Sequence, residues 1–290
     1  MLSTDALLDG ALDLHVHPAP SPFPRRLQLY EAATTAAAAG FRTIAVKSHH
    51  HSMVTDIQAV EAVAGKMPLE IISGVCLNNQ VGGLNPYAVE LSLLQGGRFV
   101  WFPTIAAAKH LATTLRTFPT SKFPLRTAVP VPVLDGDGQL RSEVTEILEL
   151  IRQADGVLAC GHLDAAEIDL VIDAAVGVGV RRIVVSHPNF VVDASPDRCA
   201  AWAEKGAYIE HSLCHYVDGS TFRKWELDTL LEYVHRVGSG RTILSSDLGQ
   251  AGNPTPVEAF RWIVPQLEQA GVAEAAIRDL VSTSARTLVD

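Results

Sequence analysis

Several histidines and one aspartate occur in this sequence at spacings that suit metal chemistry. His15 and His17 lie two residues apart in "DLHVHP", and His162, His187 and Asp247 lie in "CGHL", "VVSHP" and "LSSDLG". Two histidines at i and i+2 of an extended strand point to the same side and can reach one ion. Neutral imidazoles and a carboxylate suit Zn²⁺, Mn²⁺ or Fe²⁺. Because water bound to such an ion becomes a nucleophile near neutral pH, these residues predict a centre that activates water.

A lysine and three more histidines crowd into "VKSHHHS", residues 46–52, directly behind the apolar run "FRTIAV". Adjacent residues of an extended chain point to opposite sides, so these three histidines cannot all face one ion. The alternation selects Lys47 and His49 as the inward residues. Lys47 is expected to bridge two metals, to hold the substrate or to react with it, because burial tunes a lysine amine readily. His49 is expected at the substrate, with a ligand role left open.

The elements that would position these residues are eight short β-type segments separated by helical stretches. The segments are rich in Val, Ile and Leu, as strands covered on both faces should be. They are "ALDLH" (11–15), "FRTIAVK" (41–47), "LEIISGV" (69–75), "RFVWFPT" (98–104), "GVLACGH" (156–162), "RRIVVSH" (181–187), "AYIEHS" (207–212) and "RTILSSD" (241–247). The pattern predicts an α/β protein, a (β/α)8 TIM barrel that spans residues 1–290 as a single domain. A doubly wound open sheet is the main alternative.

The predicted barrel brings the polar residues together, because active sites of such barrels form at the carboxyl ends of the strands. In the first strand we expect Leu12, Leu14 and Val16 to face the helices, which leaves His15 and His17 inside. The same alternation is expected to turn the three remaining candidate ligands inward. Asp247 would bind the metal, take a proton from the attacking water and pass it to the leaving group.

Helix ends are marked by glycine and by capping residues. Gly40 is expected to close one helix, and Asn85 is expected to open the next as its N-cap. Asp164 with Glu167 resembles a capping box. Residues 221–237 and 256–290 are expected to be helical. The connection between the fourth and fifth strands, "TFPTSKFPLRTAVPVPVLDGDGQL", is long and contains a "DGDG" turn signal, so a small hairpin-like excursion is expected there.

Other residues could contact a substrate at the barrel mouth. Arg25 and Arg26, in "PSPFPRR", could clamp a carboxylate or phosphate group, although surface solvation accounts for them equally well. His211 follows Glu210 in the seventh strand, and either side chain could face inward. We favour His211 near the substrate.

Composition and charge exclude several classes of protein. A net charge of −9 gives nucleic-acid binding no electrostatic support, and hydrophobic residues at 48% indicate a globular chain. No apolar run is long enough to span a bilayer, and the N-terminus lacks the features of a signal peptide. The four cysteines are scattered without CxxC spacing, which favours reduced thiols and a cytoplasmic location.

With HxH on the first strand, histidines on the fifth and sixth, and an aspartate on the eighth, the chain resembles the amidohydrolase superfamily of metal-dependent hydrolases. The resemblance implies that His15, His17 and Asp247 hold one metal, expected to be Zn²⁺, and that His162 and His187 hold a second metal or contact the substrate. One or two divalent ions per chain are therefore expected. The stretches "LNNQVGGLNP" and "WFPT" resemble a little-characterised subfamily to which no activity can be attached.

One feature departs from that resemblance. Superfamily members with two metals often bridge them with a carboxylated lysine at the end of the fourth strand, but here that strand ends in "WFPT". Lys47, on the second strand, is the only lysine at a strand end. Either Lys47 takes over the bridging role, or the site works without a carboxylated lysine.

The expected function is hydrolysis of an amide, lactone, ester or cyclic carbon–nitrogen bond in a small molecule. Three alternatives stay open: a metal-dependent decarboxylase on the same scaffold, a lyase or aldolase in which Lys47 forms a Schiff base, and a non-catalytic ligand-binding barrel. A small-molecule substrate is the expected partner, with neither nucleic acid nor membrane, and both a monomer and a homo-oligomer are compatible with the sequence.

Overall fold

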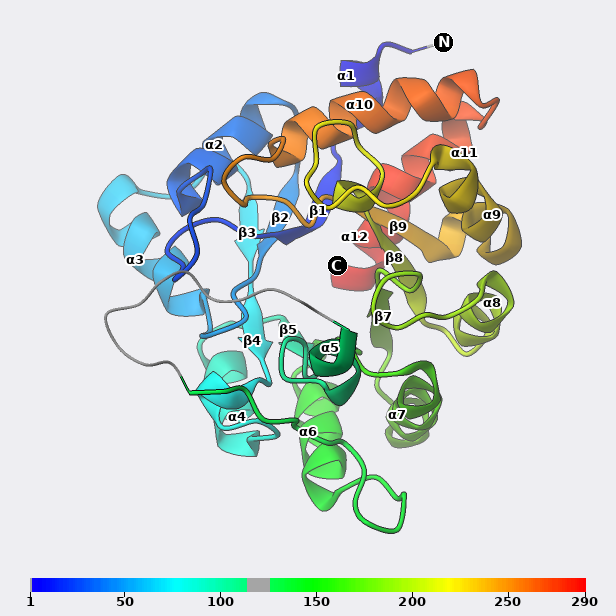
Figure 1. Cartoon of the computed structure of the whole chain (residues 1–290). Coiled ribbons are helices and arrows are strands. Elements are labelled where there is room, and N and C mark those ends of the chain that lie inside the picture. The colour runs from blue at the N-terminus through cyan, green and yellow to red at the C-terminus, as the bar shows by residue number, and fades with distance from the viewer. Residues whose placement is uncertain (1, 114–125) are drawn as a thin grey trace.

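The computed structural model describes residues 2–113 and 126–290, in which parallel strands form a ring with helices on its outside (Figure 1). The strands are β1 (Leu12–Val16), β2 (Thr43–Val46), β3 (Glu70–Ile72), β4 (Gly74–Cys76), β5 (Phe99–Trp101), β6 (Val157–Ala159), β7 (Arg182–Ser186), β8 (Tyr208–Ser212) and β9 (Thr242–Ser245). All neighbouring strands are parallel, as expected when helices cover the sheet.

Eight strands close the barrel, because β3 and β4 are two parts of one strand interrupted at Ser73. The Ser73 hydroxyl donates to the carbonyl of Val46 on one side (2.7 Å), and its own carbonyl accepts from the Arg98 amide on the other (2.7 Å). The ring closes between β1 and the end of β9, where the Asp247 amide donates to the His15 carbonyl at 2.8 Å. The predicted (β/α)8 barrel is confirmed.

The helices are α1 (Thr4–Leu8), α2 (Leu29–Ala38), α3 (Val54–Ala64), α4 (Pro86–Leu94), α5 (Ala108–Thr113), α6 (Ser142–Gln153), α7 (Ala165–Val178), α8 (Pro196–Glu204), α9 (Leu227–Val237), α10 (Pro256–Gln269), α11 (Glu274–Arg278) and α12 (Ser284–Val289). The expected caps are present: Gly40 has a φ of 85°, the Asn85 side chain accepts from a helix amide, and Asp164 forms a capping box. In the described residues no helix is long and apolar enough to cross a membrane.

Two predicted helix ranges are wrong in part. Helix α9 begins at Leu227 rather than at 221, and the segment before it is an irregular loop. The range 256–290 is interrupted after Gln269 and contains a π-helical turn, Asp279–Thr283, before α12. A glycine with positive φ, Gly271, lies in the interruption.

The barrel interior is filled by side chains from every strand and from α12. This interior cluster consists of Leu12, Leu14, Ala45, Ile72, Cys76, Phe99, Trp101, Val157, Ala159, Val184, Tyr208, Ile243, Ala285, Leu288 and Val289. Helix α12 crosses the amino ends of the strands, where Arg182 donates to the Leu288 carbonyl (2.8 Å) and Arg98 to that of Val289. The polar candidates lie at the opposite end.

Leu12 and Leu14 belong to the interior cluster, so the prediction that they face the helices is wrong. The pairing of β1 with β2 is irregular between Asp13 and Val16, and this bulge changes which residues face inward. Val16 packs on the helix side, as predicted. Leu14 and His15 therefore both face inward, although neighbouring residues of a regular strand face opposite sides.

Backbone turns, rather than alternation, also direct the ends of β6, β7 and β9. His187 and Asp247 have positive φ values of 35° and 51°. Gly161, just before His162, has a φ of 66°, and a Cβ there would lie 2.4 Å from the Phe102 carbonyl oxygen. Only glycine fits at this position, so the approach of β5 to β6 depends on it.

Part of the predicted excursion between the fourth and fifth strands is a hairpin-like turn. Leu134 and Leu140 form an isolated antiparallel bridge around the "DGDG" sequence, and the Asp135 amide donates to the Gln139 carbonyl at 2.8 Å. The start of the excursion, residues 117–125, lies outside the described residues.

Candidate metal centre

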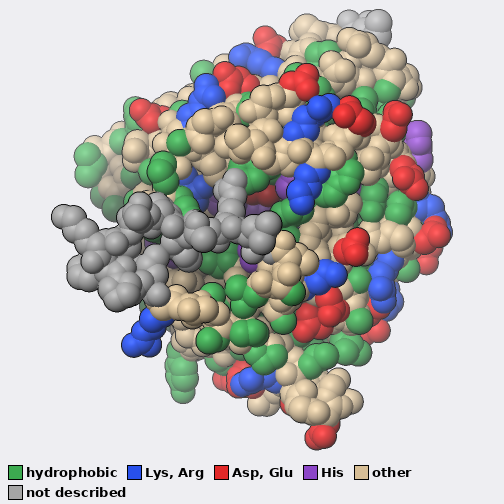
Figure 2. All heavy atoms as spheres, in the orientation of Figure 1, with side chains coloured by type: hydrophobic (Ala, Val, Ile, Leu, Met, Phe, Trp, Pro, Cys, Tyr) green, Lys and Arg blue, Asp and Glu red, His purple; other side chains and the backbone are tan. Residues whose placement is uncertain are grey.

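Three of the predicted ligands meet at the carboxyl ends of β1 and β9. The Nε2 atoms of His15 and His17 lie 3.4 Å and 3.0 Å from the same oxygen, Oδ1 of Asp247. Ligands about 2.0–2.1 Å from a tetrahedral ion are separated from one another by about 3.3 Å. The three side chains thus have the spacing of a metal site and form a group that could hold an ion. Histidine side chains are visible at the centre of this face in Figure 2.

Hydrogen bonds determine which nitrogen of each histidine is available to a metal. His15 Nδ1 donates to Glu210 Oε1 at 2.9 Å, and His17 Nδ1 donates to the Lys47 carbonyl at 2.8 Å. Since carboxylate and carbonyl oxygens only accept, both Nδ1 atoms carry the proton. The Nε2 atoms then present lone pairs toward Asp247, which is the tautomer a metal ligand needs.

Glu210 is a further candidate for the metal centre that the sequence interpretation did not select. Its Oε2 accepts a hydrogen bond from the Ser186 hydroxyl at 2.7 Å while Oε1 holds His15. A carboxylate in this position fixes the orientation of a metal-binding imidazole and raises its basicity. The alternation of β8 places Glu210 on the same side as Tyr208, which belongs to the interior cluster, whereas the sequence alone left open which of Glu210 and His211 faces inward.

The charge states of His17 and Asp247 suit a metal. Burial lowers the pKa of His17 to about 4, so the ring is neutral at pH 7. Burial alone would raise the pKa of Asp247, but the neighbouring His15 and His17 rings hold it well below its usual range. Neutral imidazoles and an ionised carboxylate are the required ligand forms.

Lys47 lies inside the barrel beside this group, as predicted from its phase. Its side chain is buried, Nζ lies 3.2 Å from His15 Nε2, and the amine is 5.5 Å from the centre of the Trp101 ring. Among the described residues no carboxylate forms an ion pair with it. The ammonium and a metal would compete for the same lone pair of His15.

His49 is held by a fixed chain of hydrogen bonds. Asn78 Oδ1 accepts from the amides of Thr104 (2.9 Å) and Ala106 (3.0 Å), so its Nδ2 must be the donor to the His49 carbonyl (2.9 Å) and to Thr104 Oγ1 (2.7 Å). The Thr104 hydroxyl proton then has His49 Nδ1 as its acceptor within the described residues, at 2.8 Å. His49 therefore carries its proton on Nε2 and presents a donor, unlike His15 and His17.

A second group of histidines lies next to the first. The rings of His162 and His187 are 4.8 Å apart, and His162 Nδ1 is 2.7 Å from Nδ1 of His110 on α5. Burial lowers the pKa of His162 and His187 well below the ordinary value, which keeps them neutral. His110 was not predicted, because it lies on a helix, where strand phase gives no signal.

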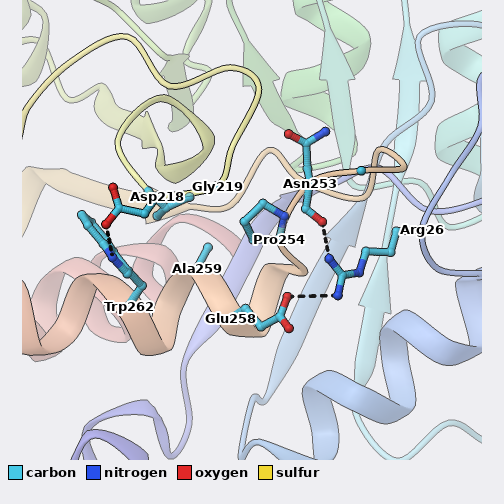
Figure 3. A pocket seen from close by; sticks show the side chains of 10 residues that line it. Arg26, Asp218, Gly219, Asn253, Pro254, Glu258, Ala259 and Trp262 are labelled. Atoms are coloured by element: carbon cyan, nitrogen blue, oxygen red, sulfur yellow. Dashed lines mark hydrogen bonds and ion pairs between the residues drawn. The ribbon is translucent and has the colours of Figure 1, made fainter.

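The two arginines of the first loop lie differently. Arg26 is exposed and faces a groove between α10 and the loops after β8 and β9, where it donates to the Asn253 carbonyl and pairs with Glu258 at 3.5 Å (Figure 3). Arg25 is half-buried, and its charge contributes to the lowered pKa of His17. Of the two, Arg25 is the one near the histidine groups.

His211 is directed away from the barrel mouth, which contradicts its expected place near the substrate. Its ring lies 5.0 Å from that of Tyr233 on α9, and Nδ1 is 3.3 Å from the Tyr216 hydroxyl. The alternation of β8 that turns Glu210 inward necessarily turns His211 toward the helices.

Comparison with protein families finds one match. A model described as a family of unknown function (DUF6282) matches residues 10–210. No curated protein matches the chain.

Solved structures share the fold over nearly the whole chain. An amidohydrolase from Pseudomonas aeruginosa has a TM-score of 0.66 at 11% identity and covers 99% of this chain and 98% of its own. The probable dipeptidase PvdM from the same organism has a TM-score of 0.64 at 12% identity, with 98% and 96% covered. A 2,6-dihydroxybenzoate decarboxylase from Rhizobium has a TM-score of 0.53 at 13% identity, with 96% and 97% covered. At these identities the likeness is one of fold.

Proposed function

Because this chain belongs to the DUF6282 family, whose function is unknown, its activity has to be inferred from the site, and we propose that it is a metal-dependent hydrolase of a small molecule. The bond attacked would be an amide, an ester, a lactone or a cyclic carbon–nitrogen bond. Membership of the amidohydrolase superfamily, a zinc-type ion and the roles of the individual residues are parts of this proposal.

The observation that carries the proposal is the convergence of His15 Nε2, His17 Nε2 and Asp247 Oδ1. The two Nε2 atoms lie 3.4 Å and 3.0 Å from Asp247 Oδ1, both rings have the tautomer of a metal ligand, and both histidines are buried. A divalent ion bound there would make a water molecule nucleophilic at neutral pH and polarise the bond under attack.

The surrounding side chains can supply the other steps of a hydrolysis. The carboxylate of Asp247 can take a proton from the attacking water and return it to the leaving group. His49 would donate its Nε2 proton in a hydrogen bond to the substrate oxygen on which negative charge develops. Arg25, the half-buried arginine of the first loop, would hold an anionic group of the substrate.

Lys47 has two roles that are compatible with its place in the barrel. A carboxylated Lys47 would stop competing for the lone pair of His15 and could bridge to a second metal. An unmodified Lys47 would have to move aside when the first metal binds, and could then hold the substrate. We propose one of these roles rather than Schiff-base chemistry, because the amine lies against a ligand atom of the metal group.

A decarboxylase on the same scaffold is the second candidate, since a solved decarboxylase shares this fold. The two reactions can be distinguished by their products, because decarboxylation releases carbon dioxide and hydrolysis consumes water. A panel of esters, lactones, cyclic amides and aromatic carboxylic acids, followed for both outcomes, distinguishes them.

Elemental analysis of a double variant tests the proposal. His15→Ala combined with His17→Ala should remove the ion that these side chains hold and abolish turnover, because only Asp247 of the three ligands would remain. His211→Ala is a matched control, since this buried histidine lies outside the metal group and should leave metal content unchanged. A metal content in the double variant equal to that of the natural chain would overturn the assignment.

A further inference from the structure

A second group of ligand atoms lies on the other side of Asp247. Cys214 and His215 belong to a short 3₁₀ turn, Leu213–His215, that follows β8. The Cys214 amide donates to the Ser246 carbonyl at 3.0 Å, which fastens this turn to the end of β9. Two potential ligands from one loop are therefore held beside the aspartate that follows β9.

The two carboxylate oxygens of Asp247 face different partners. Oδ1 is the oxygen near His15 and His17, whereas the Cys214 thiol donates to Oδ2 at 3.8 Å. A ligand atom from each of Cys214, His215 and Asp247 lies within 4.8 Å of the others. Asp247 thus belongs to two groups of three, with Oδ1 near His15 and His17 and Oδ2 near Cys214.

His215 provides an independent sign that something binds at this place. Its Nδ1 donates to the Phe222 carbonyl at 3.2 Å, so Nε2 carries a lone pair. The residue is 2% exposed, and Nε2 has no hydrogen-bond partner in the part of the chain that the structure describes. A buried acceptor without a partner destabilises a protein, so such an atom needs an explanation.

Aromatic side chains pack against His215 and fix the position of its ring. The ring lies 4.5 Å from that of Phe190 and 5.4 Å from that of Trp225. His187, whose Nδ1 is also buried and without a partner in the described residues, is 6.3 Å away between ring centres. Two unsatisfied imidazole nitrogens thus lie in the same part of the barrel mouth.

We propose that Cys214, His215 and the second oxygen of Asp247 form a second metal site, so that Asp247 bridges two ions. The inference rests on the proposed function in that Asp247 is also a ligand of the first metal. Thiolate and imidazole together favour a borderline-soft ion such as Zn²⁺, Co²⁺ or Fe²⁺ over Mg²⁺ or Ca²⁺. The bound ion would satisfy Nε2 of His215 and would displace the thiol proton of Cys214.

Cobalt titration of the full chain tests this site without a known substrate. Protein stripped of metal with a chelator is titrated with Co²⁺ while the absorption spectrum is recorded. We expect two equivalents to bind, the cysteine-containing site giving a thiolate-to-cobalt charge-transfer band in the near ultraviolet. A site made only of histidine and carboxylate gives visible d–d bands without that charge-transfer band.

Two variants and a control locate the ligand. Cys214→Ser should remove the charge-transfer band and lower the stoichiometry by one equivalent, and His215→Ala should weaken binding of the same equivalent. Cys199→Ser, at a buried cysteine on α8, should leave both readouts as in the natural chain. Circular dichroism confirms that each variant is folded. Where a variant does not fold, the presence or absence of the charge-transfer band in the natural chain still tests whether a cysteine binds cobalt.

The outcomes separate this inference from the proposed function. Binding of one equivalent without a charge-transfer band overturns the second site and leaves the first intact. Binding of two equivalents without that band places the second ion elsewhere, for example at His110, His162 and His187, and also overturns it. Binding of no metal overturns the proposed function as well.

Discussion

Substitution of Glu210 by glutamine tests whether the hydrogen bond to His15 tunes a metal site. The amide oxygen of glutamine can still accept from His15 Nδ1, which is 2.9 Å from Glu210 Oε1. The amide nitrogen replaces Oε2, and the Ser186 hydroxyl, 2.7 Å away, can rotate from donor to acceptor. The change therefore removes a buried negative charge while it keeps the shape and the hydrogen-bond count.

The expected magnitude follows from the role of a carboxylate behind a metal-binding histidine. Loss of such a partner typically lowers metal affinity about 10- to 100-fold. Because the His15 tautomer is retained in Glu210→Gln, we expect the lower end, about tenfold, which corresponds to about 1.4 kcal/mol. Glu210→Ala, which also releases the ring, should reach about 100-fold, or about 2.7 kcal/mol.

Competition with a chromophoric chelator measures these affinities for Zn²⁺ and Co²⁺. Ser186→Ala is the matched control, because it removes only the hydroxyl that donates to the other oxygen and keeps the charge. Its affinity should stay within about threefold of the natural chain. Equal affinity in the natural chain and in Glu210→Gln would refute the idea that Glu210 acts through His15 on a metal.

Three further outcomes are expected. Thr104→Val removes the hydroxyl that holds His49 Nδ1 and should lower turnover about tenfold with metal content unchanged. The control Thr104→Ser should retain turnover. Loss of metal from Thr104→Val would instead make His49 a ligand. Borohydride added with substrate should leave Lys47 unlabelled, and a chelator should abolish turnover. A labelled Lys47 together with activity that resists the chelator would indicate a Schiff-base enzyme. Burial lowers the pKa of His211 to about 3, so the unfolded chain takes up a proton that the folded chain resists, and stability should fall as the pH drops below about 6.5. The free energy of unfolding, measured by denaturant titration at several pH values, should depend less steeply on pH in His211→Phe, by up to about 1.4 kcal/mol per pH unit. An unchanged dependence on pH would mean that His211 is already protonated in the folded state.

The architecture was predictable because each strand carries its own signal. Apolar runs such as 181–187 are short and rich in β-branched residues, and the caps at Asn85 and Asp164 mark where helices begin. These signals are local, so one sequence suffices to recognise them. The one wrong helix start, at residue 221, arose because the amides of Lys224 and Trp225 donate to the His215 carbonyl, and these non-local hydrogen bonds hold the segment as a loop.

The details of side-chain direction were less predictable, because they depend on backbone irregularities that involve two strands. The bulge in β1 places Leu14 and then His15 inward, and a strictly alternating strand cannot do this. The positive φ of His187 likewise has no sequence signal, since non-glycine residues rarely adopt it. Pairings such as His162 with His110 join residues from separate elements, and spacing along the chain cannot reveal them.

The position of α12 has a consequence for the order of events in a catalytic cycle. Since Leu288 and Val289 fill the amino end of the barrel, molecules that reach the histidine groups through the described part of the chain enter and leave at the same end. In the proposed hydrolase, a product would have to depart by this end before the next substrate could enter. The product released last would then compete with substrate for the free enzyme, a kinetic pattern that can be measured as soon as a substrate is known.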